Sequence, residues 1–323
     1  MTRVLINGFG RIGRTVLRAW ALGGWPDIEI VGINDIAEPD LCAHLFEYDS
    51  VFGPFAGDVM LDGTTLHVNE FRIPFYQTND ARRLDLSDVD IVFECTGKAG
   101  TRDIAERSLI AGAQRVLISG PSEAADVTVV IGANDADLAD QKIVSNASCT
   151  TNALAPLVKL LDYTWGVRTG WMTTIHCYTG SQPTIDAPRG DMMRSRAAAM
   201  SMVPTTTSAM RLLDHVLPDL AGRIEGAAVR VPVASVSAVD LTVTLQANVS
   251  RDQVIEVLSK PNAIIGCTNK PLVSSDLRAR PESLIVSLPE TRVTAQGLLR
   301  VFGWYDNEWG FSCRMLDMAQ RMA

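Results

Sequence analysis

The chain has 323 residues, of which 47% are hydrophobic, and it carries a formal net charge of −8 at pH 7. A chain of this length suggests two domains, and its apolar content supports a sizeable core. The acidic balance argues against a general nucleic-acid-binding surface or an anionic membrane partner. No apolar stretch approaches the roughly twenty residues of a membrane span.

The cysteines, at positions 42, 95, 149, 177, 267 and 313, are scattered and form no C-x-x-C pair. This pattern is typical of reduced thiols in a cytoplasm, and it predicts neither a disulfide framework nor a metal site. The first strand is predicted to begin within residues 1–8, which leaves no room for a signal peptide.

The first predicted elements form a dinucleotide-binding turn. An apolar run at residues 4–6 leads into a G-x-G-x-x-G sequence at residues 8–13, and apolar residues then recur at helical spacing. The glycines allow a tight turn, close approach to a pyrophosphate and packing of helix on strand. A second apolar run, 28–33, leads to Asp35, where a carboxylate binds the adenosine ribose and disfavours a 2′-phosphate. The turn therefore predicts a site for NAD.

Strands and helices then alternate. Apolar strands are predicted over 90–97, 115–119 and 127–131, with a helix over 102–111. Such alternation indicates an α/β fold with a doubly wound parallel (Rossmann) sheet, whose ligands lie at the carboxyl ends of the strands. Thr96, Gly97 and Ser119 fall at such ends, although simple turn chemistry explains each equally well.

The segment Ser148-Cys149-Thr150-Thr151-Asn152 places a cysteine where a helix begins. Residues 146–148 are typical of a turn and cap, and leucines and valines follow at helical spacing up to Leu161. A thiol at a helix N-terminus faces unpaired N–H groups and the positive end of the dipole, which favours the thiolate. The alternative interpretation is a small buried cysteine.

The second half of the chain has a different pattern. A strand over 174–178 contains His176, and strands over 229–233 and 239–245 follow with few helices between them. This predicts a second, α+β domain with an antiparallel or mixed sheet. His176 is either an acid–base residue or a satisfied core histidine.

Two arginines are candidates for anion binding. Arg230 stands in the otherwise apolar strand 227–233, where an arginine is costly unless it binds an anion. Arg194 lies in a loop that enters the helix-like run 197–199. The alternative for Arg194 is a solvated surface position.

These motifs resemble the glyceraldehyde-3-phosphate dehydrogenase family. The resemblance runs from residue 3 to about 320 and rests on residues 6–14, 145–152, 173–176, 230–232 and 304–310. It implies an NAD-binding Rossmann domain over 1–148, a catalytic domain over 149–311, and a C-terminal helix over 312–323 that returns to the first domain. It also implies a homotetramer, and the scattered cysteines favour the cytoplasm.

The resemblance implies oxidation of glyceraldehyde 3-phosphate, with NAD and inorganic phosphate, to 1,3-bisphosphoglycerate through a cysteine thioester. Cys149 would be the nucleophile and His176 the acid–base residue. Cofactor-binding residues would be Gly8, Gly10, Arg11, Ile12, Gly13, Asp35, Thr96, Gly97, Ser119 and Asn307. Residues for substrate and phosphate would be Ser148, Thr150, Thr179, Arg194, Thr207, Ser208 and Arg230.

Several positions depart from the usual family pattern and bear on substrate preference and cofactor affinity. No arginine is found near residues 76–78 to flank the adenine. The substituted positions are Ala153 and Ser181, which replace a cysteine and an aspartate, Met193 and Ser208, which replace an arginine and a glycine, and Phe311, which replaces a tyrosine.

Two alternatives to this function stay open. Residues 290–296 and 313–317, with Phe311, are similar to the erythrose-4-phosphate dehydrogenase branch, which hydrolyses its thioester on a route to vitamin B6. Residues 178–180 and 204–207 are closer to the phosphorylating enzyme. A non-catalytic protein that binds nucleotide or RNA is a more remote alternative.

Overall fold

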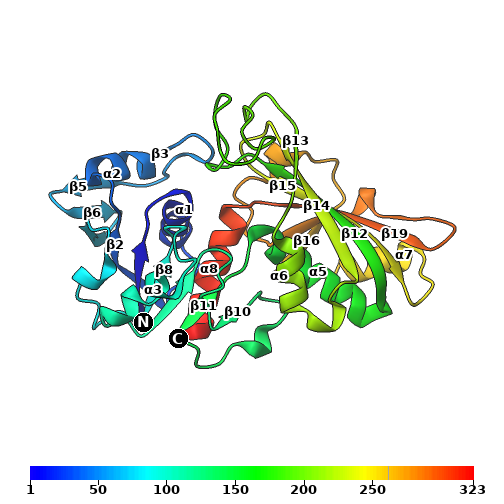
Figure 1. Cartoon of the computed structure of the whole chain (residues 1–323), viewed down its shortest axis with the longest axis horizontal. Helices are drawn as coiled ribbons and strands as arrows, with labels where there is room; N and C mark the ends of the chain where they lie inside the picture. The colour runs from blue at the N-terminus through cyan, green and yellow to red at the C-terminus, as the bar shows by residue number, and fades with distance from the viewer. Residues whose placement is uncertain (261) are drawn as a thin grey trace. The chain divides into compact units, whose positions relative to one another are not determined.

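The computed structural model describes residues 1–260 and 262–323, which form two compact units (Figure 1). Unit 1 comprises Met1–Val129, Asn134–Ala147 and Ser312–Ala323, and unit 2 comprises Val130–Ala133 and Ser148–Phe311. Each unit has its own sheet. Within the described ranges, no helix combines the length and the apolar character that crossing a membrane requires.

Unit 1 is built on a nine-stranded sheet. Its strands are β1 (Thr2–Asn7), β2 (Ile28–Asn34), β5 (Val59–Asp62), β6 (Thr65–Val68), β7 (Phe71–Tyr76), β8 (Ile91–Glu94), β9 (Arg115–Ile118), β10 (Val127–Thr128) and β11 (Ile143–Ser145). Their order is β10-β11-β9-β8-β1-β2-β7-β6-β5. Neighbours from β10 to β7 pair in parallel, and β6 and β5 form an antiparallel edge.

The order of the parallel strands confirms the predicted doubly wound sheet. From β1 the chain continues to β2 and β7 on one side, and then to β8, β9 and β11 on the other. The direction of winding therefore reverses at β1, and a doubly wound sheet binds its ligand at the carboxyl ends of the strands at such a point. The apolar residues of β1 are buried on both faces of the sheet, as expected for a parallel strand.

The helices of unit 1 follow the predicted pattern with two differences. They are α1 (Arg11–Ala21), α2 (Pro39–Glu47), α3 (Arg102–Ala105), α4 (Arg107–Ile110) and most of α8 (Trp309–Met322), with short 3₁₀ turns at Ala81–Arg83 and Asp135–Asp137. The single helix predicted over 102–111 is broken at Glu106, whose ψ of −11° departs from α-helical geometry. The strand predicted over 127–131 is only the two residues of β10.

The residues of α8 that belong to unit 1 are joined to it by polar contacts. Asp317 accepts a hydrogen bond from the Trp25 indole at 2.7 Å. Arg115 donates to the Met322 carbonyl at 2.6 Å, and Arg321 forms an ion pair with Asp135. These contacts attach the C-terminal segment to the sheet and its loops within unit 1.

The turn between β1 and α1 depends on two glycines. Gly8 has φ of +98°, and an added Cβ there would lie 2.6 Å from the backbone of Cys95. An added Cβ at Gly13 would lie only 2.1 Å from the Gly8 carbonyl oxygen. Gly10, by contrast, has no atom within 4 Å of an added Cβ. The first and third glycines are therefore required by the protein's own packing, whereas the space beside the second is open.

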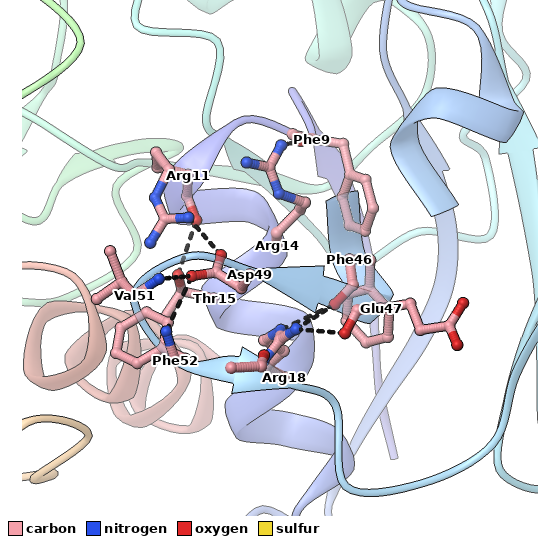
Figure 2. Close-up of polar contacts among 11 residues, drawn as sticks. Phe9, Arg11, Arg14, Thr15, Arg18, Phe46, Glu47, Asp49, Val51 and Phe52 are labelled. Carbon is pink, nitrogen blue, oxygen red and sulfur yellow. Dashed lines mark hydrogen bonds and ion pairs between the residues drawn. The ribbon is translucent and has the colours of Figure 1, made fainter. Parts of the chain in front are cut away.

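A buried arginine of α1 fixes the last residues of α2 and the segment that follows them. Figure 2 shows the Arg18 guanidinium directed at backbone carbonyls at the end of α2. It donates to the Phe46 carbonyl, to the Glu47 carbonyl at 3.0 Å and to the Gly53 carbonyl at 3.1 Å. Because its residue is only 3% exposed, these bonds compensate the cost of burying the cation.

The same segment forms a small hairpin against the start of α1. Strands β3 (Tyr48–Asp49) and β4 (Gly53–Pro54) form a separate two-stranded sheet. Asp49 accepts hydrogen bonds from the Val51 and Phe52 amides and forms an ion pair with Arg11 (Figure 2). The Arg11 guanidinium lies 5.7 Å from the centre of the Phe52 ring. The hairpin therefore holds the first residue of α1.

Unit 2 is built on an eight-stranded mixed sheet. Its strands are β12 (Val167–Cys177), β13 (Val203–Thr205), β14 (Ile224–Val231), β15 (Ser237–Leu245), β16 (Ile265–Thr268), β17 (Leu284–Ser287), β18 (Arg292–Val293) and β19 (Leu298–Tyr305). The order is β13-β14-β12-β15-β19-β17-β16, with β18 beside β19. The pairs β12–β14 and β16–β17 are parallel and the other pairs antiparallel, which confirms the predicted mixed sheet.

The helices of unit 2 are few, as predicted. They are α5 (Cys149–Trp165), α6 (Ala209–Val216) and α7 (Arg251–Leu258), with 3₁₀ turns at Pro218–Leu220, Ser274–Leu277 and Leu288–Glu290. The prediction that residues 197–199 are helical is wrong, because these residues lie in a non-helical loop with a turn. The Ala197 amide donates to Asp186 at 2.8 Å and the Ala198 amide to the Pro183 carbonyl at 3.0 Å, so both amides are bound to a distant part of the loop.

We expect Gly13→Ala to destabilise the protein, because its Cβ would overlap the Gly8 carbonyl oxygen. Overpacking of this kind costs about 1–3 kcal/mol. The measurement is the thermal melting temperature of Gly13→Ala beside Gly10→Ala, whose added methyl group meets no atom. Equal melting temperatures for the two variants would contradict the packing role of Gly13.

A second prediction concerns acid stability. Although burial alone would raise it, the Arg11 side chain and the Phe52 and Val51 amides hold the pKa of Asp49 below its usual range. A depressed carboxyl pKa contributes stability above the unfolded value of about 4, and this contribution disappears as pH falls. The melting temperature of Asp49→Asn should therefore lie furthest below wild type above pH 5 and approach it below pH 4. Asp58→Asn, at an exposed position, serves as the control and should show no such trend.

Candidate active site

Cys149 is the first residue of α5, as the sequence predicts. Ser148 caps the helix, and its hydroxyl oxygen accepts a hydrogen bond from the Thr151 amide at 3.0 Å. Ala147 precedes the cap with φ of +55°, a left-handed conformation that costs a non-glycine residue roughly 1–2 kcal/mol. The chain thus turns sharply before α5 and places Cys149 in the first turn, beside free backbone N–H groups.

The structure brings Cys149 together with His176. His176 is the penultimate residue of β12, and its Nε2 lies 3.7 Å from the Cys149 Sγ. Its Nδ1 lies 2.7 Å from the Cys177 carbonyl oxygen. In the tautomer that carries its hydrogen on Nδ1, this hydrogen is donated to the carbonyl, and Nε2 presents a lone pair to the sulfur.

Arg230 completes this group from the neighbouring strand. The register of β12 and β14 places Arg230 opposite His176. Its Nη1 donates to the Cys177 carbonyl at 2.9 Å and lies 2.7 Å from the His176 Nδ1. Because an arginine N–H can only donate, this second contact is a hydrogen bond only when the imidazole carries its hydrogen on Nε2. The half-buried guanidinium is therefore held beside the imidazole in the ligand-free chain.

Burial and charge oppose one another at this site. Burial and then Arg230 lower the pKa of His176 to about 4, so the imidazole is neutral at pH 7. Burial also raises the pKa of the Cys149 thiol, whereas Arg230 and the Thr150 hydroxyl and amide lower it. Burial therefore disfavours the thiolate form of Cys149, which the helix N-terminus was expected to favour. Moving the thiol proton to Nε2 creates both charges at once, and they attract each other across the short Sγ–Nε2 distance.

Tyr305, which was not predicted from the sequence as a site residue, contacts the residues around this pair. Its hydroxyl lies 2.9 Å from the Thr150 Oγ1 and 2.8 Å from the Thr174 Oγ1. Burial raises the pKa of Tyr305, so it stays a phenol. Because Thr150 also hydrogen-bonds Cys149, the buried phenol links β19 and β12 to the first turn of α5. Nothing in the local sequence of Tyr305 indicates this role.

The other predicted anion-binding residues of unit 2 lie in loops. Arg194 donates to the Thr205 hydroxyl at 2.6 Å and the Thr206 hydroxyl at 3.0 Å. Thr207 follows, and its hydroxyl accepts from the Ala209 amide at the start of α6, beside Ser208. The Thr179 and Ser181 hydroxyls lie 2.9 Å apart. Among the residues that the structure describes, the hydrogen bonds of Arg194 and Thr179 lead to Thr205, Thr206 and Ser181, and those of the Cys149–His176 pair lie elsewhere.

Unit 1 has a cavity of about 240 Å³ at the topological switch point. Of the predicted cofactor residues, Gly8, Gly10, Asp35 and Thr96 line it. The other lining residues are Asn7, Asn34, Ile36, Thr78, Asn79, Ala81, Glu94, Cys95, Lys98, Ile104 and Arg107. Five other predicted cofactor residues of unit 1 are not among the lining residues: Arg11, Ile12, Gly13, Gly97 and Ser119. Asn307 belongs to unit 2.

The residues of this cavity fit a dinucleotide. The open space beside Gly10, at the start of α1, is the place where a pyrophosphate meets free helix N–H groups. Asp35 is held by the Phe9 amide at 2.6 Å and the Ala37 amide at 2.9 Å, which leaves further oxygen lone pairs for ribose hydroxyls. This carboxylate at the cavity wall disfavours an additional phosphate.

A buried polar network, missed from the sequence, forms the base of the cavity. Asn7 donates to Glu94 at 2.5 Å, and Asn34 donates to Asn7 at 2.7 Å. Glu94 also accepts from the Thr96 amide at 3.0 Å. Burial raises the pKa of Glu94 despite these bonds. The only signal in the sequence is that each of Asn7, Asn34 and Glu94 ends a parallel strand.

The chain matches two family models. Residues 2–102 match the glyceraldehyde 3-phosphate dehydrogenase NAD binding domain, and residues 148–307 match the C-terminal domain of the same enzyme. The first match spans the cavity-forming turn, and the second begins at the cap of α5.

Curated relatives match over nearly the whole chain. It is 46% identical to the glyceraldehyde-3-phosphate dehydrogenase of Xanthobacter flavus, with 99% of this chain and 98% of the relative covered. The enzymes of that name from Cereibacter sphaeroides and Pseudomonas aeruginosa are 44% and 46% identical, with the same coverage. With this similarity and with both domains matched, the chain belongs to the glyceraldehyde-3-phosphate dehydrogenase family.

Proposed function

We propose that the protein oxidises glyceraldehyde 3-phosphate with NAD and inorganic phosphate, giving 1,3-bisphosphoglycerate. The observation that carries this proposal is the Cys149 Sγ in the first turn of α5, 3.7 Å from the His176 Nε2, in a chain of this family. The relatives bear the name of the triose enzyme, and none of those named above is an erythrose-4-phosphate dehydrogenase.

The chemistry begins at the sulfur. Cys149 gives up its proton to His176 and attacks the aldehyde carbon, so a C–S bond forms, and the carbonyl oxygen takes that proton back from His176 and becomes a hydroxyl. His176 then accepts the hydroxyl proton as the carbon loses a hydride, and a thioester results. NAD, when bound, supplies the acceptor for that hydride. Phosphate oxygen finally attacks the thioester carbon, and the acyl phosphate leaves as the C–S bond breaks.

Two anion sites would serve the substrate phosphate and the attacking phosphate. Thr179 lies two residues after β12, and Arg230 is the penultimate residue of β14, opposite His176. Arg194, Thr207 and Ser208 lie in the loop before α6 and at its start. Ser148 and Thr150 flank the nucleophile. Because Arg230 lowers the pKa of His176, an anion bound to Arg230 would offset this charge and make His176 a stronger base.

We assign residues 1–148 to NAD binding, 149–311 to catalysis and 312–323 to a helix that supports the first domain. The support is the cavity in unit 1, the Cys149–His176 pair in unit 2 and the polar contacts of α8 with Trp25 and Arg115. We also propose a homotetramer, on the family resemblance alone, and a cytoplasmic location, on the pattern of scattered cysteines.

The direct test compares kcat/KM for glyceraldehyde 3-phosphate and erythrose 4-phosphate, with and without phosphate, from the rate of NADH formation. We expect preference for the three-carbon aldehyde and a steep dependence on phosphate. Preference for the four-carbon aldehyde without phosphate dependence would replace this proposal with the hydrolytic one. NAD binding without turnover of either aldehyde would indicate a non-catalytic protein.

Cys149→Ala is expected to abolish aldehyde oxidation and to leave NAD affinity unchanged, because the nucleophile lies in unit 2. His176→Asn should slow the reaction by about 10²–10⁴-fold, the usual contribution of a proton-transfer residue. Cys267→Ala, at an exposed position on β16, is the control and should be as active as wild type. More than a few per cent of activity in Cys149→Ala, or less than a tenfold loss in His176→Asn, would contradict the assigned roles.

Arg194→Ala should raise the phosphate concentration that gives half-maximal rate, because the loop loses its cation beside Thr205 and Thr206. The matched control is Arg189→Ala, which removes an exposed cation from the same loop. An unchanged phosphate requirement in Arg194→Ala, or an equal increase in both variants, would show that Arg194 does not bind the attacking phosphate.

A further inference from the structure

The buried polar network of unit 1 is a row of hydrogen bonds across three neighbouring strands. The strand register places Asn34 of β2 beside Asn7 of β1, and Asn7 beside Glu94 of β8. The Asn34 Nδ2 donates to the Asn7 Oδ1 at 2.7 Å, and the Asn7 Nδ2 donates to the Glu94 Oε2 at 2.5 Å. None of these three residues is more than 7% exposed. The row therefore crosses β1, the strand at which the direction of winding reverses.

Each end of the row binds the backbone of a loop that lines the cavity. The Thr78 amide donates to the Asn34 Oδ1 at 3.0 Å, and the Thr78 carbonyl accepts from the Asn34 Nδ2 at 3.0 Å. At the other end, the Thr96 amide donates to the Glu94 Oε1 at 3.0 Å, and the Thr96 hydroxyl donates to the same oxygen. Both threonines line the cavity. The row thus connects the loop after β7 with the loop after β8.

The order of donors and acceptors along this row is fixed at both ends. Because the Thr78 backbone offers one donor and one acceptor, the Asn34 amide has a single orientation, with its nitrogen toward Asn7. The Asn7 amide must then direct its oxygen at Asn34 and its nitrogen at Glu94. At the opposite end, the Thr96 backbone amide can only donate. Both oxygens of Glu94 must therefore accept, which a carboxyl group can do and a side-chain amide cannot.

We infer that Glu94, Asn7 and Asn34 are positioning residues for the cofactor: their row of hydrogen bonds holds the loops of Thr78 and Thr96 in the positions that bind the dinucleotide. Loops that are ordered before the ligand arrives lower the entropic cost of binding. The inference goes beyond the proposed function, because it depends on NAD as the cofactor and not on the aldehyde or the thioester chemistry.

The test exchanges the carboxyl group and the amide between positions 94 and 7. Glu94→Gln and Asn7→Asp each keep the size of the side chain but break the order of donors and acceptors. The first variant turns an N–H group toward another donor, and the second places two carboxyl groups side by side. Each should weaken binding of ADP-ribose, measured by equilibrium titration, by about tenfold, because a buried polar group loses its partner.

The double variant Glu94→Gln/Asn7→Asp should restore binding to nearly that of the wild type. In this variant the nitrogen at position 94 donates to the carboxylate at position 7, and the oxygen at position 94 accepts from Thr96. The second oxygen at position 7 accepts from Asn34. Such recovery is the non-additivity expected of residues in one hydrogen-bond network. Asn248→Asp, at an exposed position in unit 2, makes the same chemical change outside the network and should bind ADP-ribose as the wild type does.

Thermal melting of every variant separates a positioning role from a purely structural one. If Glu94→Gln and Asn7→Asp melt at lower temperature but, where folded, bind ADP-ribose as the wild type does, the inference is wrong. A double variant that binds no better than the single variants, or that does not fold, also overturns it. If neither single variant folds, a folded double variant with wild-type affinity supports the inference. Failure of the wild type to bind ADP-ribose would instead overturn the assignment of the cavity to NAD, and the inference with it.

Discussion

The contact between the Cys149 sulfur and the His176 imidazole is the constraint on which the rest of unit 2 depends. Each group alone favours its neutral form, because burial raises the pKa of the thiol and lowers that of the imidazole. Only a proton transfer between them creates two charges that stabilise each other. The surrounding residues fix the distance between the Cys149 Sγ and the His176 Nε2. Ser148 caps the helix that carries the thiol, and Tyr305 links that helix to the strands.

Arg230 favours the nucleophile and weakens the base at this site, because it lowers the pKa of both groups. As a cation near the sulfur it lowers the pKa of Cys149, and beside the imidazole it lowers the pKa of His176 as well. In the ligand-free chain its guanidinium donates to the Cys177 carbonyl and lies 2.7 Å from the His176 Nδ1. An arriving phosphate group would be attracted to the same guanidinium. Substrate binding and base strength are therefore coupled through one side chain.

Unit 1 separates the residues that build the turn from those that would meet the ligand. At Gly8 and Gly13 another part of the protein's own backbone lies too close to leave room for a side chain. The space beside Gly10 is open and can hold a ligand. The ion pair of Arg11 with Asp49 and the hydrogen bond of Arg18 to the Gly53 carbonyl attach the two strands of the hairpin to α1. Arg18 also bonds the Phe46 carbonyl just before the hairpin. The start of the helix is thus fixed before any cofactor binds, which reduces the entropic cost of binding.

Local sequence determined the parts of this protein that depend on backbone conformation and periodicity. These are the glycine turn, the parallel strands, the cap at Ser148 and the position of Cys149 at a helix start. Only the tertiary structure decided which distant residues meet, such as Tyr305 with Thr150 or Cys177 with Asn307. The reason is that side-chain contacts across a sheet depend on strand order and register, which residues close in sequence do not specify. Long-range contacts also broke the helix expected at 197–199, because Asp186 and Pro183 bind the amides that a helix would need.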